Sequence, residues 1–145
     1  MSRAADESKI LHPDDLAEIE RGAGIRTRPL IGKWNTETSE LTTGVTRFGP
    51  GTSIAPHSHN REETIMILEG EATVVVRDER TDLVAGDITW VPADVPHYFI
   101  NRGTGPMRIY WVYAGRHITR TLVATGETFD HLSEQDLKVG RKDES

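Results

Sequence analysis

Two histidines and a glutamate at short, fixed spacing constrain this chain more than any other feature. His57 and His59 are two residues apart, Glu63 follows four residues later, and all three come soon after the Gly-Pro-Gly turn at 49–51. The apolar run at 64–68 and the glycines that bound this stretch are typical of a buried strand. Because side chains alternate faces along a strand, we expect all three side chains to point the same way. Two imidazoles and a carboxylate on one face predict a divalent metal site with open positions.

A second stretch, residues 86–101, offers a fourth ligand. Pro92 ends one expected strand, residues 93–96 form a turn, and His97 begins the next strand. A single histidine at the start of a strand is more often a packing or surface residue, and histidine pairs also occur on exposed loops. The prediction that His97 completes the site therefore depends on both stretches together.

The composition narrows the class of protein. With 145 residues, 36% of them hydrophobic and 28% charged, the chain is long enough for one globular domain. It has no cysteine, which excludes disulfides, thiolate zinc, iron–sulfur clusters and a cysteine nucleophile. The formal charge of −6 argues against a nucleic-acid surface. The start of the chain lacks a signal-peptide core and no apolar run approaches membrane-spanning length, so we expect a cytoplasmic protein with no membrane and no nucleic-acid partner.

Short strand-like segments separated by turns predict an all-β fold from residue 27 onward. The expected strands are 27–34, 41–48, 52–58, 63–68, 72–77, 82–84, 87–91, 97–101, 107–113 and 118–123. Short helices are expected on both sides of this region. One covers 12–20, where Pro13 suits the first turn, and the other covers 131–137, where Ser133 and Asp136 are spaced like a capping pair.

The two informative stretches resemble the two sequence motifs of the cupin superfamily. The first motif, G-x5-H-x-H-x3-E-x6-G, is matched at every fixed position by Gly51, His57, His59, Glu63 and Gly70. The second, G-x5-P-x-G-x2-H-x3-N, is matched by Gly86, Pro92, His97 and Asn101. Asp94 stands where the family has glycine. Because aspartate tolerates left-handed backbone better than most residues, this departure concerns the turn and not the fold.

The resemblance implies a small, single-domain bacterial cupin: an all-β, double-stranded β-helix (jelly-roll) barrel with short terminal helices. The barrel is expected over 27–124, after an N-terminal extension at 1–26 and before a C-terminal tail at 125–145, each with a short helix. The resemblance also implies His57, His59, Glu63 and His97 as ligands of one divalent ion. Nitrogen and oxygen ligands without sulfur suit several metals. The family favours iron, manganese or nickel, and zinc and copper stay open.

Residues around the ligands are assigned by strand parity and position. Glu62 is expected to be solvated, because only Glu63 has the spacing of the motif. Four side chains share parity with the ligands on their own strands: Ile65, Ile67, Phe99 and Asn101. All four could line the pocket, but a place in the core is favoured for Ile67 and Asn101. The parity of the strand at 107–113 stays undecided. A structural role is favoured over substrate contact for Trp90, Arg108 and Tyr110. His117 and His131 are expected at the surface.

Two classes of function are open. The first is a metal-dependent enzyme, foremost a dioxygenase whose small-molecule substrate chelates the ion, or an isomerase or lyase if the metal acts only as a Lewis acid. The second is a non-catalytic cupin that binds a metal or a small ligand. No catalytic residue is assigned beyond the metal ligands. The segment at 28–31 could cover a neighbouring chain, which predicts a homodimer formed by sheet extension or strand exchange.

Overall fold

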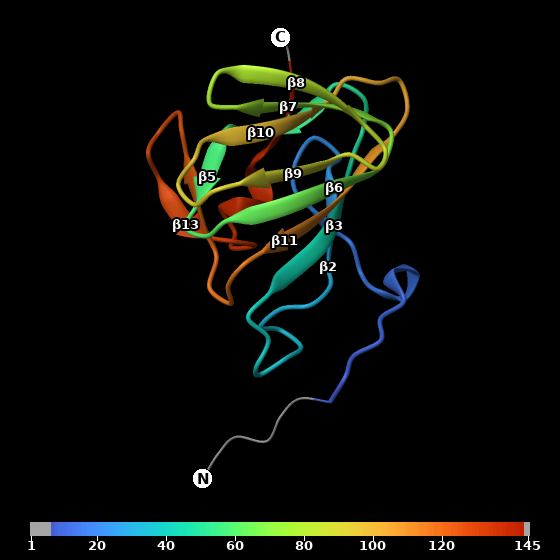
Figure 1. Cartoon of the computed structure of the whole chain (residues 1–145), viewed down its shortest axis with the longest axis vertical. Helices are drawn as coiled ribbons and strands as arrows, with labels where there is room; N and C mark the ends of the chain where they lie inside the picture. The colour runs from blue at the N-terminus through green and yellow to red at the C-terminus, as the bar shows by residue number, and fades with distance from the viewer. Residues whose placement is uncertain (1–6, 144–145) are drawn as a thin grey trace.

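The computed structural model describes residues 7–143 and consists almost entirely of β-strands in two antiparallel sheets (Figure 1). The first sheet has the order β1 (Ile19–Glu20), β2 (Arg26–Pro29), β3 (Thr42–Phe48), β11 (Met107–Tyr113), β6 (Glu63–Glu69) and β9 (Ile88–Val91). The second has the order β13 (Thr128–Asp130), β12 (Thr119–Leu122), β5 (His57–His59), β10 (His97–Asn101), β4 (Thr52–Ile54) and β14 (Gly140–Lys142). Two further strands extend the second sheet, with β7 (Glu71–Val76) paired to β10 and β8 (Glu79–Val84) paired to β7.

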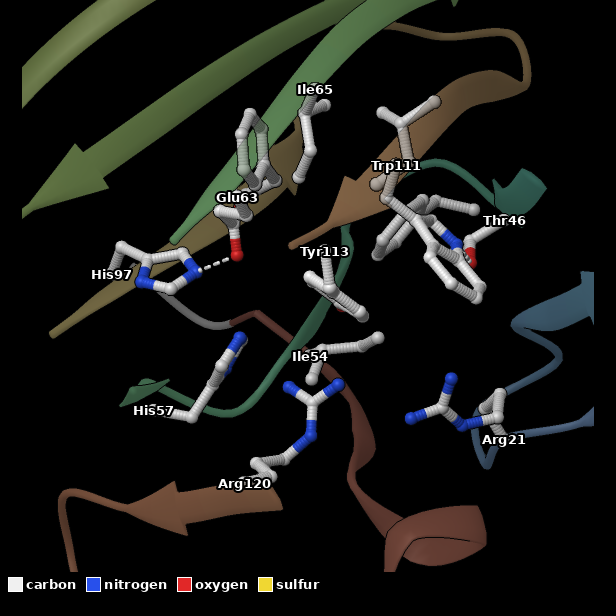
Figure 2. Close-up of a pocket in the computed structure, with 13 residues that line it drawn as sticks. Arg21, Thr46, Ile54, His57, Glu63, Ile65, His97, Trp111, Tyr113 and Arg120 are labelled. Carbon is white, nitrogen blue, oxygen red and sulfur yellow. Dashed lines mark hydrogen bonds and ion pairs between the residues drawn. The ribbon is translucent and has the colours of Figure 1, made fainter. Parts of the chain in front are cut away.

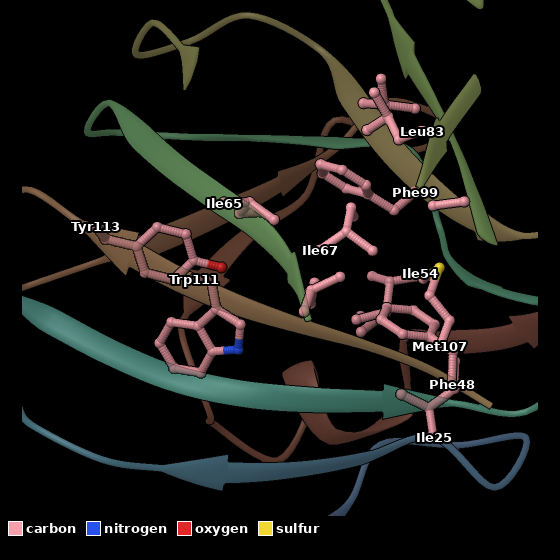
Figure 3. Close-up of a cluster of buried hydrophobic side chains, with 14 of the residues drawn as sticks. Ile25, Phe48, Ile54, Ile65, Ile67, Leu83, Phe99, Met107, Trp111 and Tyr113 are labelled. Carbon is pink, nitrogen blue, oxygen red and sulfur yellow. The ribbon is translucent and has the colours of Figure 1, made fainter. Parts of the chain in front are cut away.

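Alternating burial along the strands places one hydrophobic core between the sheets. In β6 and β11, which pair with each other, every second side chain is buried over most of the strand. This period of two is what a strand with one face toward a core requires. Apolar side chains from both sheets meet in the core (Figure 3): Phe48, Ile65, Ile67, Ile109 and Trp111 from the first, and Ile54, Ala72, Val74 and Phe99 from the second. The all-β jelly-roll prediction is confirmed.

Left-handed backbone occurs in the turn after β6 and in the turn before β10. Gly70 has a φ of +88° between β6 and β7, and a Cβ there would collide with the carbonyl oxygen of Pro106. Asp94 has a φ of +66° and its amide donates to the His59 carbonyl over 2.8 Å. Aspartate therefore adopts the left-handed conformation that the motif ordinarily assigns to glycine.

The helix predicted over 12–20 is wrong in most of its length. Only a single 3₁₀ turn, η1 (Pro13–Asp15), forms there, and Ile19–Glu20 is strand β1, paired with β2. The Glu20 carboxylate accepts hydrogen bonds from the amides of Gly22 and Gly24, which closes a tight turn. Pairing with β2 thus outweighs the weak local preference for helix.

The C-terminal segment is also more strand-like than predicted. The helix expected over 131–137 is only the 3₁₀ turn η2 (Asp136–Lys138), while β13 and β14 join the second sheet. Strands therefore occur on both sides of the 27–124 region assigned to the barrel. Residues 1–6 and 144–145 of the expected terminal segments lie outside the described residues.

Three of the expected strands differ clearly from those observed. The segment 52–58 is two strands, β4 and β5, because the chain leaves the ladder at Ala55 and Pro56. The first expected strand ends at Pro29 rather than at residue 34, and β8 begins at Glu79 because the hairpin turn is only Arg77–Asp78. Within the described part of the chain, no helix has the length and apolar character needed to span a bilayer.

Candidate metal centre

The four predicted ligands gather at one place in the barrel, but from both sheets. His57 and His59 lie on β5 and His97 opens β10, where it is the cross-strand partner of His57. Glu63 opens β6, which belongs to the other sheet. The expectation that the first three side chains share one strand face is therefore wrong. The chain turns between sheets at residues 60–62, and the carboxylate approaches the histidines from across the core (Figure 2).

Backbone carbonyls fix the orientation of all three imidazoles. Nδ1 of His57 donates to the carbonyl of Ala55 at 2.6 Å. In the same way Nδ1 of His59 donates to Thr119 at 3.0 Å, and Nδ1 of His97 donates to Val95 at 2.9 Å. A carbonyl can only accept, so each ring carries a proton on Nδ1. The Nε2 lone pairs of His57 and His59 are left for another partner, whereas His97 Nε2 donates to Glu63 Oε1 and must release that proton before it can bind an ion. One ring nitrogen from each histidine lies within 4.8 Å of the others.

Glu63 supplies the negative charge in this cluster. Its Oε1 lies 2.7 Å from His97 Nε2 and 3.5 Å from His59 Nε2. Among residues 7–143, neither Glu63 Oε2 nor His59 Nε2 has a hydrogen-bond partner, although both atoms are buried. Unpaired buried polar atoms are costly. A cation held by both atoms would remove that cost, so the donor set fits a divalent metal ion. The three buried histidines could hold one.

Burial keeps the histidines on β5 in the form that binds metals. Desolvation, helped by the positive charge of Arg120, holds the pKa of His57 and of His59 well below the ordinary value. Desolvation opposes ionisation of Glu63 too, but the charge and hydrogen bond of His97 hold the Glu63 pKa below its usual value. Two neutral imidazoles and an ionised carboxylate are thus present at neutral pH, as metal ligation requires.

A small cavity of about 30 Å³ adjoins the cluster, and its lining tests the parity predictions. Ile65 and Phe99 line it, as predicted, whereas Ile67 lies in the core. Asn101 is structural, since its side-chain amide donates to the carbonyls of Phe48 and Gly105. The space is sufficient for water or a small group.

The inward face of strand β11 could not be decided from the sequence. In the structure its odd-numbered residues face the core. Trp111 and Tyr113 line the cavity, while Arg108 and Tyr110 are only partly buried on the other face. Tyr113 is the cross-strand partner of Glu63, and its ring centroid is 4.5 Å from that of His59. Because directly opposed residues of antiparallel strands share a face, Tyr113 lies beside the ligands. The charge of Arg108 could have decided this parity from the sequence, because a charged side chain faces outward by default.

Three charged residues at the base of the cavity were missed by sequence reasoning. Arg120 on β12 is the cross-strand partner of His59 and lines the cavity together with Arg21. Both arginines pair with Asp136, and all three side chains are almost fully buried. Arg21 and Asp136 are distant in sequence from both motifs, so no local pattern marks them. Only the register of β12 against β5 reveals the role of Arg120.

The two histidines expected at the surface differ. His117 is exposed beside Asp130, as predicted. His131 is not an ordinary surface residue: its ring packs edge-on against Trp111 and Tyr113, with centroids 5.1 and 5.2 Å away. Burial lowers the pKa of His131 to about 3. The segment after β13 folds back over β11, which no local pattern in the sequence indicated.

Glu62 and Trp90 both lie on the outer surface, away from the cavity. Glu62 is exposed and accepts a hydrogen bond from Trp90 Nε1 at 3.0 Å. Trp90 is 62% exposed on β9 and does not line the cavity, which leaves it no contact with a ligand bound there.

Comparison with known proteins agrees with the two motifs and the fold. Residues 44–113 match the family model of the cupin domain. These residues form a cupin domain. The chain is 28% identical over 89 residues to dimethylsulfoniopropionate lyase DddW of Ruegeria pomeroyi, a match that covers 61% of this chain and 57% of that protein. The aligned part is thus little more than half of the relative.

Solved structures share the fold at low sequence identity. A sugar phosphate isomerase of the cupin superfamily from Silicibacter pomeroyi superposes with a TM-score of 0.67 at 18% identity, over 89% of this chain and 99% of that one. KdgF from Halomonas superposes with a TM-score of 0.65 at 19% identity, over 76% of this chain and 96% of that one. At this level of identity the likeness concerns the fold alone.

Proposed function

We propose that this cupin is a metal-dependent enzyme that acts on a small molecule by Lewis-acid chemistry, as a lyase or an isomerase. The observation that carries the proposal is the anchoring of three imidazoles by backbone carbonyls. It directs their remaining nitrogens, with the Glu63 carboxylate, at one buried point beside a cavity. The metal ligands are His57, His59, Glu63 and His97.

The donor set limits the metal without naming it. Three imidazole nitrogens and one carboxylate oxygen suit iron, manganese or nickel, and zinc or copper also accept such ligands. Any of these divalent ions would polarise a substrate oxygen and stabilise negative charge that develops on it. The ligands would hold the ion beside the cavity, and Tyr113 and Arg120 line the same space that a substrate would enter.

Tyr113 is the residue placed to move a proton. Burial raises the pKa of its phenol, which therefore stays protonated at neutral pH. Among residues 7–143 no hydrogen bond is assigned to its hydroxyl, and the side chain lines the cavity beside Glu63 and His59. A neutral phenol in this position would donate its proton to a substrate oxygen or carbon as negative charge develops there.

The relatives favour the same class of reaction. The sequence relative is named as a lyase, and one neighbour in fold is named as an isomerase. A metal-dependent lyase or isomerase uses a Lewis acid and a proton-transferring side chain, and this cavity would offer both once an ion is bound. The dioxygenase expected from the family resemblance stays a prediction, because no feature of the cavity is specific to dioxygen chemistry.

A turnover assay without oxygen tests the proposal. Protein loaded with zinc, manganese or iron(II) is incubated under argon with a panel of small hydroxy acids, keto acids and dimethylsulfoniopropionate, and products are followed by NMR. We expect zinc or manganese protein to turn over one of these compounds, and His59→Ala to be inactive. Turnover that requires iron and dioxygen would favour the dioxygenase. Stoichiometric binding without turnover under any condition would favour the non-catalytic binding protein.

A further inference from the structure

We propose that Arg120, held in place by Asp136 and Arg21, forms a carboxylate-binding subsite, and that the substrate of the proposed reaction is a small carboxylate. Calling the bound carboxylate a substrate rests on the proposed function, but the subsite itself follows from side chains that are not metal ligands. The guanidinium group of Arg120 is buried, and only part of its hydrogen-bonding capacity is satisfied.

Only one donor of the Arg120 side chain forms a hydrogen bond within the described part of the protein. Its Nε donates to Asp136 Oδ1 at 2.6 Å, the one hydrogen bond that residues 7–143 provide for this side chain. Its Nη1 is buried with no hydrogen-bond partner in that same part of the chain. The side chain lines the cavity, and Figure 2 shows its terminal nitrogens directed into the space between His57, Ile54 and Tyr113. A buried guanidinium with unused donors is strongly destabilising unless a ligand or water satisfies it.

Asp136 and Arg21 fix this guanidinium instead of neutralising it. Arg21 donates from Nε to the Asp136 carbonyl, from Nη1 to Thr27 Oγ1, and its Nη2 lies 3.0 Å from Asp136 Oδ2. Its donors are thus directed mainly at the protein. Asp136 Oδ2 also accepts from the Leu132 amide at 2.6 Å. One carboxylate therefore faces two guanidinium groups, and one positive charge at the base of the cavity has no counterpart there.

A metal ion would add to this positive charge. A divalent ion held by neutral imidazoles and the single carboxylate of Glu63 would keep about one net positive charge of its own. The cavity would thus be lined by two positive groups, Arg120 and the ion that His57, Glu63 and His97 would hold. Arg120 is directly opposite His59 in the β12–β5 ladder, so its side chain lies on the same face of that ladder as a proposed metal ligand.

The shape of the donors and the size of the cavity select the kind of anion. The two terminal nitrogens of a guanidinium match the two oxygens of a planar carboxylate, which forms a bidentate pair. A cavity of about 30 Å³ leaves room for a compact group. The ligand class is therefore a short-chain carboxylate, with a second oxygen-bearing group for the metal ligands that line the same cavity.

Malonate and malonamide provide a matched pair of probes. Their binding to the zinc-loaded protein is measured by calorimetry for the wild type, Arg120→Gln, Arg120→Lys and the control Arg108→Gln, an outward-facing residue of β11. We expect malonate to bind the wild type and malonamide not to bind. Arg120→Gln should weaken malonate binding roughly 30-fold or more, Arg120→Lys should weaken it less because it keeps the charge, and the control should be unchanged. Inorganic phosphate that binds as tightly as malonate would overturn the assignment to carboxylates.

Two measurements keep this inference separate from the proposed function and from misfolding. Zinc content of each variant reports on the metal site: a full complement of zinc with malonate affinity unchanged in Arg120→Gln overturns the subsite and leaves the proposed function standing. Malonate binding to the zinc-free wild type that depends on Arg120 supports the subsite even if no metal binds. If Arg120→Gln does not fold, a crystal structure of the wild type with malonate decides. A carboxylate paired with the Arg120 terminal nitrogens supports the inference, and malonate elsewhere or absent contradicts it.

Discussion

Glu63 Oε1 lies 2.7 Å from His97 Nε2, and this pair joins the first sheet of the barrel to the second. The same two atoms are proposed ligands of one metal ion, so a bound ion would link the sheets at the point where the core opens into the cavity. A ligand that binds only the folded state stabilises it by mass action.

Metal addition should therefore raise the melting temperature. Free zinc at a hundred times its dissociation constant contributes about 2.7 kcal/mol, which corresponds to roughly 5–10 °C for a chain of this size. Differential scanning fluorimetry with zinc and with EDTA measures the shift, and His59→Ala should lose it. An identical melting temperature for the wild type in zinc and in EDTA would count against the site.

Tyr113→Phe should separate catalysis from metal binding. The substitution removes one hydroxyl and keeps the ring against His59, so metal content and melting temperature should stay close to those of the wild type. If Tyr113 transfers the proton, kcat should fall by about 10²–10⁴-fold. Tyr110→Phe, on the opposite face of the same strand, is the matched control and should retain full activity. Unchanged kcat in Tyr113→Phe would remove this residue from the mechanism.

His131 should make the protein less stable in mild acid. Its pKa is about 3 in the folded chain and near the ordinary 6.5 when unfolded, so the unfolded chain binds more protons between these values. The stabilisation is complete above pH 6.5 and is lost as the pH falls toward 3. His57 and His59, whose pKa values are also lowered, act in the same direction.

The change His131→Phe isolates the contribution of one histidine, because it keeps an aromatic ring against Trp111 and Tyr113. Below pH 6.5, urea unfolding should show a shallower loss of stability than in the wild type, by about 1.4 kcal/mol per pH unit. The exposed His117→Gln should follow the wild type. Equal pH slopes in His131→Phe and the wild type would show that this ring is not buried as a neutral group.

The homodimer remains a proposal, and the structure offers a second surface on which it could form. Strand β1 pairs only with Arg26 and Thr27, so it does not cover the segment 28–31, whose ladder partner is β3. The opposite edge of that sheet, β9, exposes Ile88 and Trp90, each 62% accessible. Light scattering at micromolar concentration should give twice the mass of one 16.2 kDa chain, and Ile88→Asp should halve it. A monomer mass for the wild type contradicts this proposal.

Much of the metal centre could be predicted from the sequence because its residues lie in two short, locally patterned stretches. Spacing, together with the resemblance to the two cupin motifs, selected His57, His59, Glu63 and His97, and the strand pattern was enough for the all-β fold. The approach of Glu63 from the opposite sheet was missed, because the break at residues 60–62 has no strong glycine or proline signal.

The base of the cavity could not be predicted, because it depends on register and on long-range contacts. Arg120 faces His59 only if β12 pairs with β5 in one particular register, and a shift of one residue would turn it to solvent. Asp136 meets Arg21 across 115 positions of sequence. Such contacts form because burying a charge without a partner is costly, and no local sequence pattern shows which distant residue will be that partner.

The most direct test of the central claim is the metal content of the ligand variants. Protein is stripped with chelator, reloaded with zinc or manganese, desalted and measured by plasma mass spectrometry. The wild type and the exposed control His117→Ala should hold one ion per chain. His57→Ala, His59→Ala and His97→Ala should each retain roughly a tenth or less while their far-UV circular dichroism stays that of a β protein. Full occupancy in His59→Ala would contradict the proposed metal centre.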